Sequence, residues 1–380
     1  MKTLLVHGQP SWRFSSDRVE AAVTRTGGHL APVTFRPGRR TVEPFSVAPW
    51  AEEKSISGLP PLLQALRGDF FCAPFGNNDE PARGERHPAH GETAQSDWQF
   101  ESLTRSETAT ELHLSLQTKV RPGRVEKMIR LRTCETALYC RHRISGMTGP
   151  MNFGHHATLK FPDRPRAGLL STSRLHYAQV LPTTFEEPVN RGYSSLKPGA
   201  TFSRLDRVPM VNGGHADLSH YPARRGYEDL AMLVHEARPD FAWTAVSFPE
   251  EGYVWFALKD PRVLRSTVLW ISNGGRHYPP WNGRHVNVMG LEDVTSYFHY
   301  GLAPSIRPNP VNRLGFPTAL ALSARKPLVV NYIMAVAAIP RGFGRVTTII
   351  PGKDKVTLVS GASRRIVTAI DVDFLYEKSL

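Results

Sequence analysis

Residues 112–117 read Leu-His-Leu-Ser-Leu-Gln, with a leucine at every second position. Successive side chains of a β-strand point to opposite faces, so this alternation is typical of a half-buried strand in an antiparallel sheet. A second apolar run follows at residues 125–131, and Pro122-Gly123 between the two runs predicts a hairpin turn. The same alternation returns at residues 138–144 and makes Cys140 a buried thiol. This part of the chain therefore predicts an antiparallel β structure.

The rest of the chain continues this pattern. Residues 241–248 and 253–258 predict a second hairpin around Pro249-Glu250-Glu251-Gly252. Further predicted strands cover residues 33–35, 70–75, 98–103, 268–272, 328–339, 345–350 and 366–372. Helical signals are few: residues 60–67 predict a short helix opened by proline, and residues 291–302 have some helical spacing.

We find no internal repeat of 20–50 residues and no low-complexity linker in the 380 residues. The fold class that follows is all-β, with one large antiparallel β sandwich. We expect residues 1–380 to form a single domain, in which the strands of residues 1–60 complete the sheets.

Charge excludes little by itself. The chain has 47 Lys and Arg against 34 Asp and Glu, a net charge of +13. The basic residues are scattered, and the densest groups are pairs such as Arg39-Arg40 and Arg364-Arg365, so we interpret them as a solvated basic surface and expect no nucleic-acid partner. A weaker interpretation is attraction of anionic ligands such as acidic or phosphorylated sugars.

Cysteine count and apolar stretches bear on location. Three cysteines without a paired motif argue against a disulfide framework or a zinc knuckle. The N-terminal apolar run is too short for a signal peptide, and the stretch 327–339 is too short to span a bilayer. We therefore expect a soluble, cytoplasmic protein with no membrane partner.

Four long segments interrupt the predicted strands, at residues 76–97, 186–226, 272–287 and 303–314. Two of them contain His87, His90, His277 and His285. Loops held by a rigid scaffold carry much of the binding chemistry of proteins. These histidines favour functional loops over disordered linkers.

Three residues at loop boundaries have the side chains of acid–base chemistry: His90, His156 and Glu292. Each has a structural alternative. His90 could be an exposed loop histidine. One of His155 and His156 should be packed as structure, because neighbours on a strand face opposite ways. Glu292 could be a charge at the start of a short helix.

Three segments in this order resemble the aldose 1-epimerases, or galactose mutarotases. The first is Ala73-Pro74-Phe75-Gly76, followed by His90-Gly91 and Trp98. The second is Phe153-Gly154-His155-His156, and the third is Gly290-Leu291-Glu292-Asp293-Val294-Thr295. The resemblance covers about residues 69–340 and implies a large antiparallel β sandwich that acts on a sugar.

In such a reaction a base removes the proton of the C1 hydroxyl and an acid protonates the ring oxygen. A carboxylate and an imidazole suit these roles. The resemblance implies Glu292 as base, His156 as acid and His90 as a hydrogen-bonding partner near the ring oxygen. It also implies an acidic residue after a Gly-Tyr pair for the distal hydroxyls. Gly226-Tyr227-Glu228-Asp229 offers two such acids, of which we prefer Asp229. No cofactor is implied.

The remaining predicted substrate contacts are Trp281, Arg276, His155 and Arg86. Trp281 can stack on the CH face of a pyranose, and Arg276 can meet an acidic or phosphorylated sugar. The family follows its first motif with Asn-Arg, whereas Gly76 here is followed by Asn77-Asn78, and the next arginines are Arg83 and Arg86. The chain thus resembles a divergent relative of the galactose mutarotases.

Three alternatives remain open on the sequence. The same fold could be a non-catalytic carbohydrate-binding module, or the basic surface could serve an interaction protein. His87 and His90 with His155 or His156 could also hold a divalent metal, although the first interpretation needs none. The expected partner is a small-molecule sugar or sugar derivative, and the oligomeric state is left open.

Overall fold

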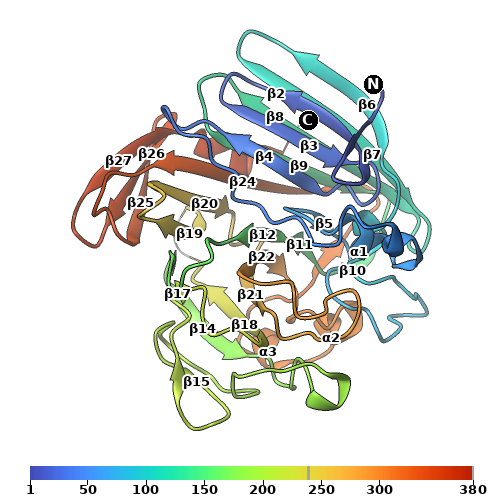
Figure 1. The fold of residues 1–380 in the computed structure, drawn as a ribbon. Coiled ribbons are helices and arrows are strands. Elements are labelled where there is room, and N and C mark those ends of the chain that lie inside the picture. Colours follow the sequence, from blue (N-terminus) through green and yellow to red (C-terminus); the bar gives the residue numbers. More distant parts are fainter. Residues whose placement is uncertain (238–239, 379–380) are drawn as a thin grey trace.

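The computed structural model describes residues 1–237 and 240–378. Within these residues, seven strands form an antiparallel sheet in the order β14-β18-β21-β22-β11-β5, with β12 also paired to β22 (Figure 1). The bounds are β14 (Leu175–Val180), β18 (Tyr227–His235), β21 (Ser266–Asn273), β22 (Val288–Thr295), β11 (Phe153–His155), β12 (Ala157–Lys160) and β5 (Phe71–Cys72).

A second large sheet contains nine strands of the described chain, in the order β17-β13-β19-β20-β24-β9-β8-β7-β6. They are β17 (His220–Tyr221), β13 (Gly168–Thr172), β19 (Ala242–Phe248), β20 (Tyr253–Lys259), β24 (Leu328–Ala338), β9 (Ala137–Ser145), β8 (Gly123–Arg132), β7 (Ala109–Thr118) and β6 (Gln99–Arg105). The predicted all-β sandwich is confirmed.

Smaller sheets and short helices complete the fold. The small sheets are β1 (Leu4–Val6), β2 (Gln9–Ser15), β3 (Val19–Thr24) and β4 (Leu30–Phe35); β25 (Val346–Gly352), β26 (Lys355–Ser360) and β27 (Arg365–Ala369); β10 (Gly149–Met151) with β23 (Leu320–Leu322); and β15 (Val208–Pro209) with β16 (His215–Ala216). The α-helices are α1 (Pro61–Ala65), α2 (Leu302–Ile306) and α3 (Pro310–Arg313), and 3₁₀ turns cover Lys54–Gly58, Glu92–Ala94, Pro188–Asn190 and Val372–Tyr376. None of the helices in the described residues has the length and apolar character needed to span a membrane.

Both predicted hairpins are confirmed. Thr118 pairs with Gly123 across the first turn, and Phe248 pairs with Tyr253 across the second. The predicted helix at residues 60–67 is α1. The helical spacing at residues 291–302 is misleading, because this stretch begins inside strand β22. Every residue of β22 is buried, so the strand lacks the apolar–polar alternation that identifies a half-exposed strand.

The N-terminal strands require a correction. Residues 1–60 were expected to complete the large sheets, but β1–β4 pair with one another as a four-stranded sheet. Isolated bridges such as Leu30–Asp69 and Phe45–Leu159 join this region to the rest. Several apolar side chains of β2–β4, including Trp12 and Phe14, belong to the main core cluster.

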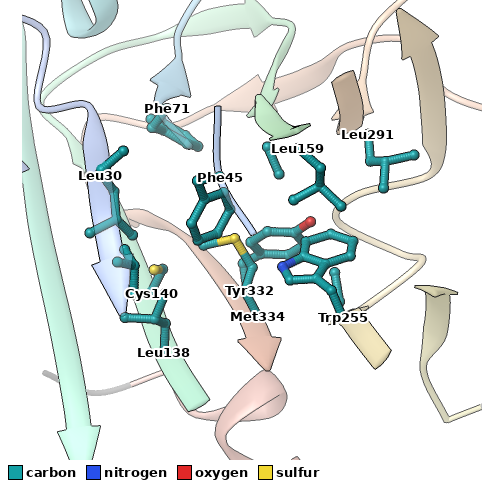
Figure 2. Packing of buried hydrophobic residues seen from close by; sticks show 14 of the residues in the cluster. Leu30, Phe45, Phe71, Leu138, Cys140, Leu159, Trp255, Leu291, Tyr332 and Met334 are labelled. Atoms are coloured by element: carbon teal, nitrogen blue, oxygen red, sulfur yellow. The ribbon is translucent and has the colours of Figure 1, made fainter. Parts of the chain in front are cut away.

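The two large sheets face each other across that core. Leu159 and Leu291 from the seven-stranded sheet, and Tyr332 and Met334 from the nine-stranded sheet, converge with Phe45 of the N-terminal region in Figure 2. The outer face of the nine-stranded sheet is covered by β25–β27, at the red end of the chain in Figure 1. The outer face of the seven-stranded sheet is covered instead by α1 and loops, and this is where the candidate site lies.

Candidate active site

A cavity of about 320 Å³ opens on the outer face of the seven-stranded sheet. Its floor is formed by Leu230 of β18, Trp270 of β21 and Glu292 of β22, and loops and α1 supply the walls. The complete lining is Leu62, Leu63, Leu66, Phe70, Asn77, Ala89, His90, His156, Phe185, Glu186, Leu230, Trp270, Arg276, Tyr278, Trp281, Glu292 and His299. The cavity therefore gathers all three predicted acid–base residues.

Strand alternation aims Glu292 into this cavity. Its neighbours on β22, Leu291 and Asp293, point the other way, since Leu291 lies in the core and Asp293 accepts a hydrogen bond of 2.7 Å from the Tyr332 hydroxyl of the opposite sheet. Gly290, two residues before Glu292 on the same face, leaves room for the carboxylate: a Cβ there would lie 2.8 Å from Glu292 Oε1.

His156 and Glu292 form a buried pair. Nε2 of His156 lies 3.2 Å from Oε1 of Glu292, while Nδ1 lies 3.2 Å from the Thr158 hydroxyl. The imidazole stacks on Phe70, with ring centroids 4.4 Å apart. Burial raises the pKa of Glu292 well above its usual range, and burial lowers the pKa of His156 well below its own. Both shifts favour a protonated carboxyl beside a neutral imidazole, so the pair is uncharged around neutral pH.

His90 completes this corner of the cavity. Its ring centroid lies 5.1 Å from that of His156, in an edge-to-face arrangement. Its backbone is left-handed, with φ of 58°, and its N–H donates to the carbonyl of Gly76 at 2.7 Å. The next residue must be glycine, because Gly91 has φ of 74° and a Cβ would lie 2.3 Å from the Ala73 carbonyl oxygen. Burial lowers the pKa of His90 to about 4, so this histidine is neutral at pH 7.

The opposite end of the cavity is built around Arg276. Its Nε donates to Glu186 Oε1 at 2.6 Å and lies 4.0 Å from Glu228 Oε2. Its guanidinium carbon lies 4.4 Å from the ring centroid of Trp281, and the Tyr278 hydroxyl donates to Glu186 at 3.1 Å. The single arginine of the cavity lining is therefore held by two carboxylates and an indole ring.

No protein-family model and no curated protein sequence matches this chain. Solved structures do match. A candidate aldose 1-epimerase from Escherichia coli K12 superposes with a TM-score of 0.58 at 14% identity, covering 87% of this chain and 100% of that chain. Galactose mutarotase-like proteins from Clostridium acetobutylicum (TM-score 0.56, 11% identity, 89% and 98% covered) and Lactobacillus casei ATCC 334 (0.54, 10%, 86% and 99%) are also similar. The chain has the galactose mutarotase-like fold.

Within this galactose mutarotase-like fold, the predicted role of Asp229 is corrected. Asp229 lies on the face of β18 away from the cavity, where it accepts hydrogen bonds from the backbone N–H groups of Ser195 and Leu196 at 3.0 and 2.9 Å. Glu228, one residue earlier, occupies the cavity side and accepts from Trp270 Nε1 at 3.1 Å. Neighbours on a strand face opposite sides, so only one of the two acids can serve the site.

Two other predicted contacts lie elsewhere. His155 points between the sheets, where Nδ1 lies 2.8 Å from Asp69 Oδ2 and the ring stacks on Tyr332. Arg86 is exposed in its loop and does not line the cavity. Of the predicted substrate contacts, Trp281 and Arg276 do line it.

The metal interpretation finds no support in the geometry. His87 turns toward Glu85, with Nε2 2.9 Å from Oε2, while His155 lies in the core. Among residues 1–237 and 240–378, no group of three or more His, Cys, Asp or Glu side chains is arranged to hold a metal ion.

Four polar lining residues were missed from the sequence: Glu186, Tyr278, His299 and Asn77. They come from four separate loops, which follow β14, β21, β22 and β5 respectively. Asn77, Glu186 and Tyr278 lie in three of the long segments predicted to be functional loops, and Asn77 also lies where the chain departs from the family motif. Asn78 is structural, since its amide donates to the carbonyls of Gly76 and Pro88 at 2.9 and 3.0 Å and ties the loops together.

Proposed function

We propose that this protein binds a small sugar in the cavity and interconverts its anomers by acid–base ring opening. The observation that carries the proposal is the contact between His156 and Glu292 at 3.2 Å, with His90 beside them in one cavity. A volume of about 320 Å³ lies at the lower end of the range for small-molecule sites, which favours one sugar ring over a long oligosaccharide.

The walls suit a pyranose. Trp270, Trp281 and Phe70 offer flat apolar surfaces for the CH groups of the ring. Arg276 and Glu186 offer donors and acceptors for hydroxyl groups at the far end. In this orientation C1 and the ring oxygen lie at the His156–Glu292 corner.

The reaction needs one proton removed and one supplied. The carboxyl proton of Glu292 first moves to His156 across their 3.2 Å contact. Glu292 as carboxylate then takes the proton of the C1 hydroxyl, the C1–O1 double bond forms, the bond from C1 to the ring oxygen breaks, and that oxygen takes the proton of the His156 imidazolium. After rotation about C1–C2 the same transfers run in reverse, so the pair ends with the proton it began with. Hydroxyl donors of a bound sugar stabilise the ionised form of Glu292, which burial by itself disfavours.

Exchange spectroscopy by NMR across a panel of aldoses, including acidic and phosphorylated ones, tests the proposal. We expect faster exchange between α and β anomers for at least one sugar. Glu292→Gln should lower the rate by about a hundredfold or more, the usual contribution of a positioned base. No acceleration for any sugar would refute the proposal.

A binding module without turnover is the second candidate. The observation in its favour is the burial of Glu292, which raises its pKa and so favours the protonated form that cannot act as a base. A binding module would show quenching of Trp281 fluorescence by sugar in both the native protein and Glu292→Gln, with no anomer exchange in either. Both functions therefore predict fluorescence quenching by sugar, and only the epimerase predicts anomer exchange.

A further inference from the structure

A buried thiol contacts His90 from behind the cavity. Cys72, in β5, is 0% exposed and does not line the cavity. Its Sγ lies 3.3 Å from Nδ1 of His90, within hydrogen-bonding distance for sulfur. We propose that Cys72 is a positioning residue, whose S–H donates to Nδ1 of His90 and keeps the imidazole proton on Nε2, facing the substrate. The consequence for catalysis rests on the proposed function, whereas the tautomer does not.

The direction of this hydrogen bond follows from what each group can do. Burial raises the pKa of the Cys72 thiol well above its usual range, so the thiol keeps its proton. His90 is neutral at pH 7 and has one protonated and one unprotonated ring nitrogen. Sulfur is a weak acceptor, whereas an unprotonated imidazole nitrogen is a good one. The pairing that satisfies both groups is therefore S–H to Nδ1.

The surroundings of His90 leave the ring little freedom. Phe70 and Phe75 contact it edge to face, with centroids 5.9 and 5.1 Å away, and its backbone N–H is fixed to Gly76. Within the described residues the thiol is the ring's one hydrogen-bonding partner. Nε2 is thus left as a donor for an oxygen of the bound ligand. This arrangement suits His90 as a neutral hydrogen-bonding partner of the ring oxygen, and not as an acid or a base.

The alternative is that Cys72 only fills space in the core. Cys140 provides a matched control, because it is also a buried thiol on a strand of the same protein, 1% exposed, and it makes no contact with the cavity. Replacing either cysteine by alanine removes a buried sulfur. Only the Cys72 variant removes a hydrogen bond to His90.

The test is ¹⁵N–¹H correlation NMR of the imidazoles in the full chain labelled with ¹⁵N-histidine, with the His90 signals assigned from His90→Gln. We expect the Nε2–H tautomer in the native protein, in Cys72→Ser and in Cys140→Ala. In Cys72→Ala the proton should be shared between the two nitrogens. An Nδ1–H tautomer in the native protein, or an unchanged tautomer in Cys72→Ala, would overturn the proposal. Circular dichroism confirms that each variant is folded.

Kinetics on a responding sugar gives the second readout. Cys72→Ala should lower kcat/KM about fivefold, the factor that corresponds to one ordinary hydrogen bond, and Cys72→Ser should restore it. Cys140→Ala should retain the native value. Equal losses in the two alanine variants would show a packing role and overturn the proposal. If no sugar is turned over, the proposed function fails while the NMR result still decides the role of Cys72.

Discussion

Glu228 shows how a single residue sets the charge of the cavity. It is fully buried beneath Arg276, accepts hydrogen bonds from Trp270 and Ser272, and lies 4.0 Å from the guanidinium. Burial raises its pKa to about 7 although Arg276 opposes the shift. Near neutral pH the Arg276 end is thus close to a change of charge, while the His156–Glu292 end stays neutral.

This shift predicts a pH-dependent stability difference for Glu228→Gln. The folded protein holds the Glu228 proton more tightly than the unfolded chain, so the stabilising contribution is full below pH 4.5 and is lost as pH rises toward 7. Glutamine mimics the protonated acid at every pH. We expect the stability of the variant relative to the native protein to increase by about 3 kcal/mol between pH 4 and pH 8. Urea unfolding across this range measures it, and a pH-independent difference would contradict the assignment.

The element that organises the site is strand β22. It pairs with β21, β11 and β12, and it places Glu292 in the cavity while Asp293 faces the opposite sheet. A shift of one residue in its register would exchange these two acids. The geometry of the site is therefore a consequence of strand pairing.

Gly290→Ala tests this at the level of the strand. The new Cβ would lie 2.8 Å from Glu292 Oε1 and 3.1 Å from Trp270 Cβ. We therefore expect a moderate loss of stability, about 1–3 kcal/mol, together with a clear loss of anomer exchange. Gly154→Ala is the contrasting variant, because its Cβ would lie 2.5 Å from the Asp293 carbonyl oxygen of the β22 backbone. It should lower the melting temperature markedly. Full activity in Gly290→Ala would show that Glu292 does not need its present position.

The sequence predicted what depends on local pattern. Alternation at residues 112–117 and the turn at Pro122-Gly123 are local features, and the strands and hairpin lie where they were expected. Strand β22 was partly misread because loops bury its outer face as well as its inner one. His155 and Asp229 were assigned to the cavity wrongly, because the face to which a strand residue points depends on register with other strands. Glu186 and His299 come from long loops whose paths leave no periodic signal.

At the scale of the whole molecule, the core is continuous. One cluster joins Trp12 of the N-terminal sheet to Leu114, Leu291 and Tyr332 of the two large sheets. A second cluster attaches β25–β27 through the opposite side of β20 and β24. Because side chains of β20 and β24 belong to both clusters, the parts of the fold that these clusters hold together should unfold together.

We therefore expect a single cooperative thermal transition for the full chain. Its calorimetric and van't Hoff enthalpies should agree, as they do for a two-state unit. Differential scanning calorimetry measures both. A separate transition for the C-terminal sheet would contradict the prediction that residues 1–380 form one domain. In that case the variant Phe343→Ala, in the second cluster, should show the same separate transition.

The anomer exchange rate of a responding aldose at pH 7, compared between Glu292→Gln and Asp229→Asn, tests the central claim most directly. Both residues are buried acids on neighbouring parts of one sheet, but only Glu292 lines the cavity. We expect Glu292→Gln to lose about a hundredfold or more of the exchange rate, and Asp229→Asn to retain it while remaining folded. Equal rates in the two variants would contradict the assignment of Glu292 as the base.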